Sequence, residues 1–411
     1  MITTARLDSG IRLVTESMPE VASLSLGVWV GTGSRDETPE QSGISHFLEH
    51  LLFKGTPERT AREIAEEIDA VGGDMNAYTT KEYTTFYVRA LSEDLELASD
   101  ILCDILSRPA LRPEEVDAER QVILEEVLMH RDEPADVVQE HFAAAMFPTH
   151  PLGREVLGEP AVIRNVTVPA IRSFFDTHYL PGNMVIAAAG DLDHDRLAVA
   201  VEARFGDRHG GCPPLRRAPS DVVVPLVVES RDSEQAQLVL GVRAPDRHSA
   251  DRFVLAVLNH ILGGGLSSRL FQEIREARGL AYSIGSDYSA YDDAGTLAIS
   301  VGTSPDHAHE VLELLHAELG RFGAEGITPR ELEVAKGHLR ADMLLSLEDS
   351  GSRMSRIGTS LLLFGAVLTT EELLGRIDAV TCEQVRSIAA QMLTGPRTLA
   401  VVGPFVEADF R

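Results

Sequence analysis

The sequence predicts an α+β protein made of two homologous α/β sandwich domains, each a mainly antiparallel sheet packed against helices. Two observations predict it. A chain of 411 residues is longer than one ordinary hydrophobic core requires. The order of expected strands and helices also repeats on either side of a polar stretch rich in Gly and Pro. The repeat implies an internal duplication of a unit of about 200 residues.

The first half is expected to open with two strands rich in β-forming residues, followed by a short helix around His46. Thr60 and Glu63 form a capping box that starts a second helix, which ends at the pair Gly72-Gly73. Pro113 is well placed as the first residue of a long helix. The strands expected in this half are 11–18, 22–31, 74–80, 83–91 and 183–190, and the further helices are 92–107, 113–129, a stretch to 147, 169–178 and a stretch to 205.

Residues 209–221 have the composition of a linker, which places one domain at 1–208 and the second at 222–411. Setting Pro113 on Pro329 aligns the residues that follow without gaps. The elements expected after the linker are strands at 236–243, 280–291, 295–303 and 398–402, an apolar helix ending at 263, and helices at 267–277, after 305 and after 329.

The short helix of the first half carries the pattern His46-Phe-Leu-Glu-His50. Side chains four apart emerge on one helical face, so two imidazoles can reach one metal ion. Glu49 lies close enough to that face to reach a metal-bound water without ligating the metal. This is H-x-x-E-H, the inversion of the commoner zinc-protease pattern.

The duplication provides an internal control for this pattern. Aligning Gly55 with Gly263 puts Val254, Val257 and Leu258 at the positions of His46, Glu49 and His50. Polar residues confined to one copy are hard to explain as packing. The second copy is therefore expected to keep the scaffold without the metal site.

The long helix that starts at Pro113 offers three candidates for a third ligand, Glu119, Glu125 and Glu126, although each alone could equally belong to a solvated helix face. Glu119 and Glu126 are two turns apart on one face, whereas Glu125 points about 100° away from Glu126. One of the two could bind the metal while the other holds a histidine ligand.

Composition limits the other possibilities. A net charge of −27, with no basic cluster, argues against nucleic acid as a partner, and an acidic interior could attract basic peptides instead. The longest apolar run, 361–368, is too short to cross a bilayer, and the first residues hold no apolar signal core, so we expect no membrane span and a cytoplasmic location. Three isolated cysteines argue against disulfides and against a cysteine-rich metal site.

The motifs together resemble the pitrilysin-type inverted zinc metallopeptidases, most of all the β-subunit of mitochondrial processing peptidase and its bacterial homologues. The resemblance covers nearly the whole chain. The motifs that carry it are His46–His50, the run Glu119–Glu126, Asn76–Glu82, His178–Met184, Gly263–Phe271 and Arg275–Tyr282.

The resemblance implies that His46, His50 and Glu126 bind one Zn²⁺ per chain, that Glu49 is the general base and that Glu119 is a supporting carboxylate. It also implies a sheet edge where an extended peptide adds as a strand, with Asn76 and Ala77 as candidates for backbone contact.

Arg275 and Tyr282 resemble the family's pair that holds the substrate and the developing oxyanion. Single-chain relatives carry four such units, with zinc in the first and this pair in the fourth. We therefore expect a homodimer in which Arg275 and Tyr282 serve the partner's zinc.

The function expected is a zinc endopeptidase that acts on extended, possibly basic or presequence-like, peptides inside a chamber formed by two chains. Two alternatives remain open at this point. One is a catalytically silent core or scaffold subunit of the same family, and the other is a zinc hydrolase of small molecules.

Overall fold

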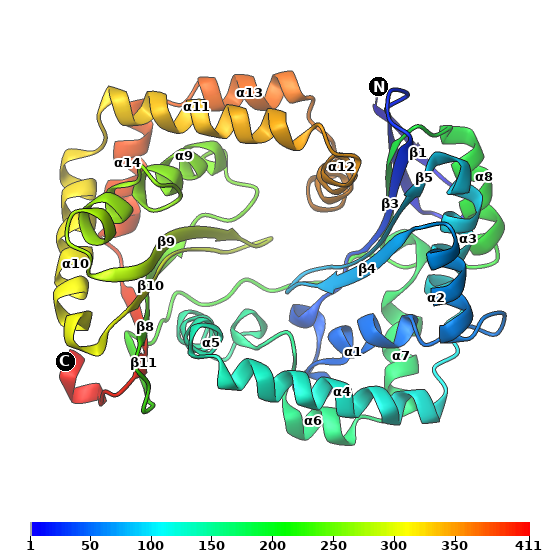
Figure 1. Cartoon of the computed structure of the whole chain (residues 1–411), viewed down its shortest axis with the longest axis horizontal. Coiled ribbons are helices and arrows are strands. Elements are labelled where there is room, and N and C mark those ends of the chain that lie inside the picture. Colours follow the sequence, from blue (N-terminus) through cyan, green and yellow to red (C-terminus); the bar gives the residue numbers. More distant parts are fainter. Residues whose placement is uncertain (1) are drawn as a thin grey trace. The chain divides into compact units, whose positions relative to one another are not determined.

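The computed structural model describes residues 2–411, which form two compact units. Unit 1 comprises the chain up to Leu128, residues 154–216 and residues 344–367. Unit 2 comprises residues 129–153, 217–343 and 368–411. Each unit contains one sheet with helices on both of its faces (Figure 1).

The sheet of unit 1 has six strands in the order β1-β2-β6-β3-β5-β4. Only β2 and β6 pair in parallel, and every other neighbouring pair is antiparallel. The strands are β1 (Ile2–Arg6), β2 (Arg12–Ser17), β3 (Ser23–Val30), β4 (Asp74–Thr79), β5 (Thr84–Leu91) and β6 (Met184–Gly190).

Helices cover both faces of this sheet because both faces are apolar. One face packs against a large core that includes buried residues of the helix carrying His46 and of six other helices of this unit. The other face buries Trp29 and Val185 against Met354 and Ile357 of α12 (Ser350–Phe364). The remaining helices of this unit are α1 (Ile44–Leu52), α2 (Ala61–Ala70), α3 (Leu95–Ser107), most of α4 (Pro113–Asp132), α6 (Pro160–Asn165), α7 (Val168–His178) and α8 (His194–Phe205).

The sheet of unit 2 has five strands in the order β7-β11-β8-β10-β9, of which only β7 and β11 pair in parallel. One face packs against the long helices, and the other buries Val138, Phe142 and Met146 of α5 (Pro134–Met146). The elements are β7 (Leu226–Ser230), β8 (Ala236–Ala244), β9 (Ala281–Ala290), β10 (Gly295–Thr303), β11 (Arg397–Gly403), α9 (Arg252–Leu262), α10 (Ala308–Glu325), α11 (Pro329–Ser346), α13 (Thr370–Asp378) and α14 (Cys382–Leu393).

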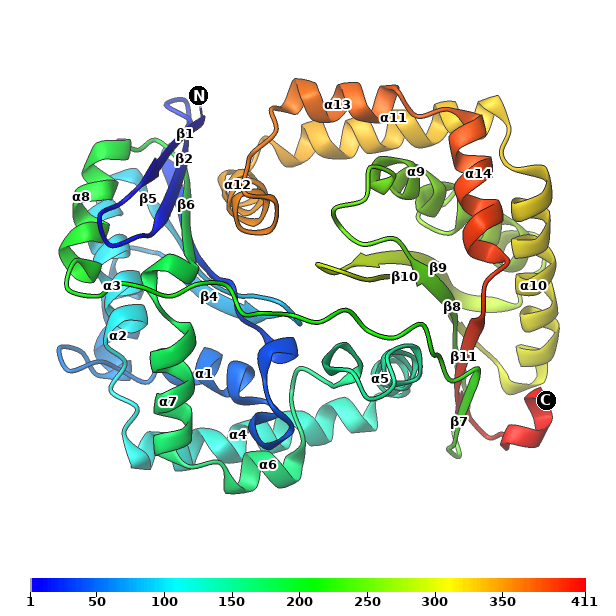
Figure 2. The ribbon, with the colours of Figure 1, turned by 180° about the vertical axis from the view of Figure 1, so that it is seen from behind.

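These sheets confirm the predicted fold class of two mainly antiparallel α/β units. The compact units nevertheless differ from the continuous ranges 1–208 and 222–411. Residues 129–153 pack in unit 2 and residues 344–367 pack in unit 1, because α5 and α12 each cover the second face of a sheet from the other half of the sequence. The stretch between α8 and β7 has no helix or strand and runs extended (Figure 2).

Several local features follow the sequence closely, and others do not. The capping box of Thr60 and Glu63 is present at the start of α2. The helix expected over 267–277 is a π-helix over Phe271–Glu276, and the one expected from Ser92 starts as a 3₁₀ turn before α3. Strands β1 and β7 were not predicted, because the sequence around them alternates weakly.

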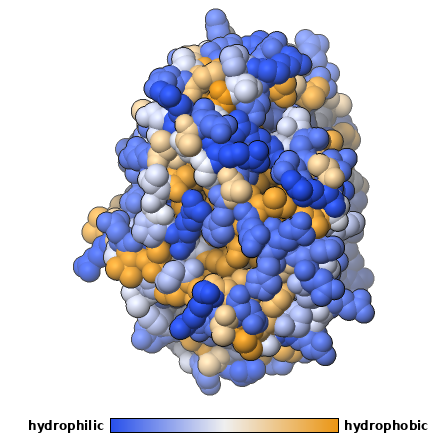
Figure 3. Space-filling model, turned by 90° about the vertical axis from the view of Figure 1, so that its left-hand side faces the viewer, coloured by the Kyte–Doolittle hydropathy of each residue, from blue (hydrophilic) through white to orange (hydrophobic). Residues whose placement is uncertain are grey.

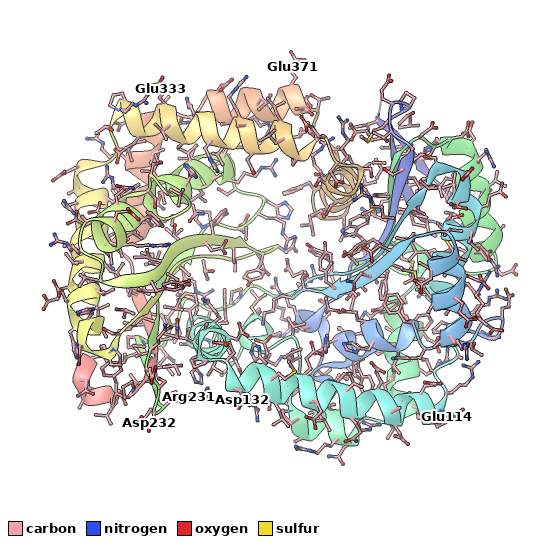
Figure 4. All side chains as sticks on the ribbon, in the orientation of Figure 1. Glu114, Asp132, Arg231, Asp232, Glu333 and Glu371 are labelled. Atoms are coloured by element: carbon pink, nitrogen blue, oxygen red, sulfur yellow. The ribbon has the colours of Figure 1, made fainter. Side chains whose placement is uncertain are left out.

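Surface acids carry much of the net charge. Glu333 on α11 and Glu371 on α13 project from the outer surface (Figure 4). The face of unit 2 in Figure 3 is mainly hydrophilic, with apolar residues gathered across its middle. Within residues 2–411, every helix is too short or too polar to span a membrane.

Candidate metal centre

Helix α1 positions the histidine pair because its other face is anchored in the core. Phe47, Leu48 and Leu51 are almost completely buried. The carboxylate of Glu37 accepts hydrogen bonds from the backbone N–H groups of Gly43 and Ser45, both at 2.8 Å. These are free donors at a helix N-terminus, so Glu37 closes the start of the helix. Burial raises the pKa of Glu37 to about 7, although the two backbone donors oppose the shift.

Three ligand atoms converge on one point beside α1. His46 Nε2 lies 3.3 Å from His50 Nε2, and Glu126 Oε2 lies 3.6 Å from the first and 3.5 Å from the second. Tetrahedral zinc with bonds of about 2.0 to 2.1 Å separates its ligand atoms by about 3.3 to 3.4 Å. Among the described residues these three form a group able to hold a metal ion. The predicted ligand set therefore fits zinc.

Glu119 fixes the chemical form of His50. Its Oε1 lies 2.8 Å from His50 Nδ1, while its Oε2 lies 2.7 Å from Lys54 Nζ. A carboxylate only accepts, so Nδ1 carries the proton and the lone pair of Nε2 is free for a metal. The sequence predicted the supporting role of Glu119 but not Lys54, which stands one helical turn after His50 and pairs with the second oxygen.

The surroundings of the two histidines have opposite effects on their pKa values. Burial, together with the nearby His50, lowers the pKa of His46 to about 3, so His46 is neutral, as a ligand must be. Burial also acts to lower the pKa of His50, but the hydrogen bond to Glu119 and the charges of Glu126, Glu119 and Glu49 outweigh it and raise the pKa. Negative charge is thus concentrated where a cation would sit. His46 Nδ1 is buried and has no hydrogen-bond partner among residues 2–411.

Glu49 is held by a residue that the sequence analysis missed. Thr79 Oγ1 donates a hydrogen bond of 2.6 Å to Glu49 Oε2 from the end of β4. Burial raises the pKa of Glu49, and the Thr79 hydrogen bond and the charge of His50 partly offset the rise. One carboxylate oxygen is thereby fixed, which leaves the other to act on a proton. No sequence pattern singles out Thr79, because the contact joins a helix to a strand 30 residues away.

The metal position is open on one side. The side chain of Glu126 is 42% exposed, whereas that of His46 is only 7% exposed. Three protein ligands with one open direction are typical of catalytic rather than structural zinc.

The strand predicted to bind an extended peptide, β4, lies at the edge of its sheet. β4 ends the sheet and pairs only with β5. Asn76 Oδ1 accepts a hydrogen bond of 2.8 Å from the backbone N–H of Ala77, which shows that this donor is not used by β5. The predicted contact positions Asn76 and Ala77 thus lie on the terminal strand of the sheet.

Arg275 and Tyr282 lie in unit 2 and are close to each other. The Arg275 guanidinium carbon lies 5.9 Å from the centre of the Tyr282 ring and 4.8 Å from that of Phe271. Tyr282 is 80% exposed, although large aromatic side chains are usually buried. The structure thus brings this pair together in unit 2, and the metal cluster lies in unit 1.

The second copy has the expected scaffold without ligands. Val254, Val257 and Leu258, which match the motif residues, are buried in the core of unit 2. Ala335, which matches Glu119, is also fully buried. Four of these positions are therefore filled by apolar packing in unit 2, whereas the position that matches Glu126 holds Asp342, which is exposed.

Comparisons with known proteins agree with this geometry. Residues 12–160 match the model of the insulinase family of peptidases, M16, and residues 165–339 match the model of the M16 inactive domain. An uncharacterized zinc protease of Mycobacterium leprae is 44% identical over 97% of this chain and 91% of its own. The uncharacterized zinc protease YmxG of Bacillus subtilis is 38% identical over 98% of both chains.

Two solved structures share the fold. A protein from Pseudomonas fluorescens described as a peptidase M16 inactive domain superposes with a TM-score of 0.92 at 21% identity, covering 99% of this chain and 98% of its own. A protease from Helicobacter pylori gives a TM-score of 0.90 at 22% identity, covering 98% and 99%. Taken with the relatives that match along its whole length, this chain belongs to the M16, pitrilysin-type family of zinc peptidases.

Proposed function

We propose that unit 1 hydrolyses peptide bonds with a zinc ion held by His46, His50 and Glu126, and with Glu49 as the general base. One observation carries the proposal. Three ligand atoms converge at the spacing of a tetrahedral zinc site, one side of which is open. A scaffold subunit would have no need for such an arrangement beside a fixed carboxylate.

Zinc, when bound, supplies a water whose pKa is lowered to about 7 and polarises the carbonyl under attack. Glu49 takes the proton of the attacking water and returns it to the leaving amine. Its raised pKa helps the second half of this transfer, because a carboxyl group works best when its pKa approaches the working pH. Thr79 keeps Glu49 oriented while the proton moves.

The substrate that fits is an extended peptide that adds to the free edge of β4. The N–H of Ala77, which now bonds to the side chain of Asn76, is available to a peptide carbonyl once that side chain turns away. Main-chain bonding of this kind is independent of sequence, so it selects extended peptides. The charge of −27 favours basic ones at long range.

We further propose a homodimer that encloses a chamber, in which Arg275 and Tyr282 act on the peptide bound at the partner's zinc. The exposure of Tyr282 and its closeness to Arg275 support a role outside unit 2. Processing-peptidase-like specificity and a cytoplasmic location stay predictions.

The central test is cleavage of a quenched fluorescent peptide library by the zinc-loaded protein. Glu49→Gln should abolish cleavage and retain zinc, whereas Glu125→Gln, an exposed carboxylate on the same helix as Glu126, should leave both intact. Zinc binding without peptide cleavage by the native protein would instead favour the scaffold alternative. Turnover of small esters without peptides would favour the small-molecule hydrolase.

The dimer has its own test. Glu49→Gln and Tyr282→Phe chains, each inactive alone, are mixed and allowed to exchange. Recovered cleavage in the mixture supports action across two chains, and its absence after confirmed exchange contradicts it.

A further inference from the structure

The segment between α8 and β7 runs extended (Figure 2), yet it carries one side chain that is nearly buried. Most residues from 207 to 225 are exposed, and Leu215 is completely so. The side chain of Arg216, by contrast, is only 12% exposed. Arg216 is also the last residue of this segment that belongs to unit 1, and its hydrogen bonds go to other residues of unit 1.

The guanidinium group of Arg216 binds Asp36 through two parallel hydrogen bonds. Its Nε donates to Asp36 Oδ1 at 2.9 Å, and its Nη2 donates to Asp36 Oδ2 at 2.8 Å. Paired, charge-assisted bonds of this kind are strong and directional. Asp36 lies in the short helix η1 (Ser34–Asp36), and its side chain is only 2% exposed. The pair therefore fixes both the position and the orientation of the guanidinium group.

Arg216 also binds two backbone carbonyl groups. Its Nη2 donates to the carbonyl oxygen of Glu82 at 2.6 Å and, more weakly, to that of Gly31 at 3.3 Å. Glu82 lies in the turn between β4 and β5, and Gly31 directly follows β3. One side chain thus connects the end of β3, η1 and the β4–β5 turn.

The β4–β5 turn is held by η1 as well. The backbone N–H of Ser34 donates to the carbonyl oxygen of Thr80 at 3.2 Å. A Cβ atom at Gly33 would come within 2.3 Å of that same oxygen, so the segment leading into η1 lies directly against the turn. Arg35 Nη1 lies 2.6 Å from Glu82 Oε1 in a second buried ion pair. The turn is therefore fixed by η1 and by Arg216 together.

This turn directly follows Thr79, the residue that orients Glu49. Thr79 and Thr84 form the last pair of the β4–β5 ladder, and Thr79 Oγ1 donates to Glu49 Oε2 at 2.6 Å. The residues of β4 further from the turn are held by the other pairs of the ladder. A movement of the turn therefore displaces Thr79 before it displaces the rest of β4. A hydrogen bond this short tolerates little displacement of its donor.

We propose that Arg216 is a positioning residue for peptide hydrolysis, which holds the β4–β5 turn and thereby, through Thr79, the general base Glu49. The inference rests on the proposed peptidase function. The partners of Arg216 are Asp36, Glu82 and Gly31, so it acts through the turn and not on the substrate or the metal.

Lysine at this position would keep the charge and lose the paired geometry. An ammonium group is a compact point charge with three hydrogens, so it cannot bind both oxygens of Asp36 in parallel and also both carbonyl groups. Arg216→Lys still leaves a cation beside the buried carboxylate of Asp36, whereas Arg216→Ala would leave that carboxylate without compensation. Arg216→Lys is therefore the variant that removes the positioning with the least damage to the fold.

The test is steady-state cleavage of a fluorogenic peptide by the full-length protein with zinc bound. Arg216→Lys should lower kcat about tenfold, as for loss of the Thr79 hydrogen bond itself. KM and zinc affinity should stay within about twofold of the native values, because the ladder of β4 and the metal ligands are unchanged. Arg217→Lys, a change of the exposed next arginine, is the matched control and should keep the native kcat.

A double variant separates positioning from a general loss of structure. Thr79→Val removes the hydroxyl through which Arg216 is proposed to act. Adding Arg216→Lys to Thr79→Val should therefore change kcat by less than about twofold, since residues that act in one chain of contacts are not additive. If Arg216→Lys lowers kcat by the same factor with and without the Thr79 hydroxyl, the positioning role is wrong.

A second variant and a second measurement make the test independent of one substitution and of activity. Asp36→Asn weakens the same paired contact from the other side and should give the same fall in kcat, including when Arg216→Lys does not fold. Amide hydrogen exchange at Ser34 and Thr80, measured without peptide, should be faster in both variants, because both amides donate at the turn. Native exchange rates at these amides in both variants would overturn the proposal.

The result also distinguishes this inference from the proposed function. If the native protein cleaves peptides and both Arg216→Lys and Asp36→Asn keep the native kcat, the positioning role is wrong and the proposed function stands. If the native zinc-loaded protein cleaves no peptide, the proposed function is wrong and the positioning role falls with it.

Discussion

Replacing Glu119 by glutamine should weaken zinc binding, and the reason lies in its two partners. The carboxylate accepts from His50 Nδ1 with one oxygen and from Lys54 with the other. Glutamine has only one oxygen. If that oxygen faces Lys54, the amide NH₂ faces His50 and drives the ring proton to Nε2, where the metal must bind. If it faces His50, the NH₂ opposes the Lys54 ammonium.

The loss expected is that of a residue that orients a metal ligand, about 10- to 100-fold in zinc affinity. This corresponds to about 1.4 to 2.8 kcal/mol. Removing Lys54 as well should recover part of it, because the glutamine oxygen is then free to turn to His50. The double variant Lys54→Met, Glu119→Gln should therefore bind zinc more tightly than Glu119→Gln alone.

Zinc affinity is measured by competition with a chromogenic chelator at fixed pH and salt. Glu125→Gln, an exposed carboxylate on the same helix, is the control and should bind zinc like the native chain. The reasoning is refuted if Glu119→Gln retains native affinity. If Lys54→Met, Glu119→Gln binds zinc more weakly than Glu119→Gln alone, the proposed effect of Lys54 on the glutamine side chain is wrong.

Three further results are expected. Thr79→Val should lower kcat about tenfold with unchanged zinc affinity and KM, because Glu49 loses the hydrogen bond that orients it. Thr79→Ser keeps the hydroxyl and should restore kcat. An equal loss of kcat in both variants would indicate a packing effect instead. The pKa of Glu37 is about 7 in the fold against 4.5 for the free group, so the folded state binds this proton more tightly. The contribution of Glu37 to stability is therefore greatest below about pH 4.5 and falls as the pH rises to 7, by on the order of 3 kcal/mol. Urea unfolding at pH 5 and pH 8 should thus show a smaller decline for Glu37→Gln than for the native chain, and equal declines would contradict the shift. Zinc at 100 times its Kd should raise the free energy of unfolding by about 2.7 kcal/mol, and Glu126→Gln should reduce this gain at the same zinc concentration, as read from thermal unfolding with and without a chelator.

The candidate metal ligands could be selected from the sequence because each depends on local periodicity. His46 and His50 share a face of one helix, and Glu119 and Glu126 share a face of another, so two short windows define the donors. That the two helices meet could not be derived from spacing, and came from the family resemblance. Their meeting is set by the burial of apolar residues such as Phe47 and Val116 in one core.

Contacts between elements far apart in the sequence were missed for the same reason. Thr79 reaches Glu49 from a strand, and its position depends on the register of β4 against β5. Register follows from how both strands pack, which no single window contains. Trp29 Nε1 has no hydrogen-bond partner among residues 2–411, which is likewise a property of the packed structure, since tryptophan in a strand is ordinarily interpreted as core.

A linker in the sequence does not by itself locate the domain boundaries here, because α5 packs in unit 2 and α12 packs in unit 1. Residues 1–208 contain the whole six-stranded sheet but not α12, so Trp29 and Val185, both fully buried in the fold, would face water. The same range carries α5, whose Val138 and Phe142 belong to the core of unit 2. Each fully buried apolar side chain of this size contributes roughly 1.5 to 3 kcal/mol, and a domain is stable by only about 5 to 15 kcal/mol. Leaving several such side chains uncovered therefore removes most of the margin, so unit 1 depends on a helix that the chain supplies only after most of the second half has been made.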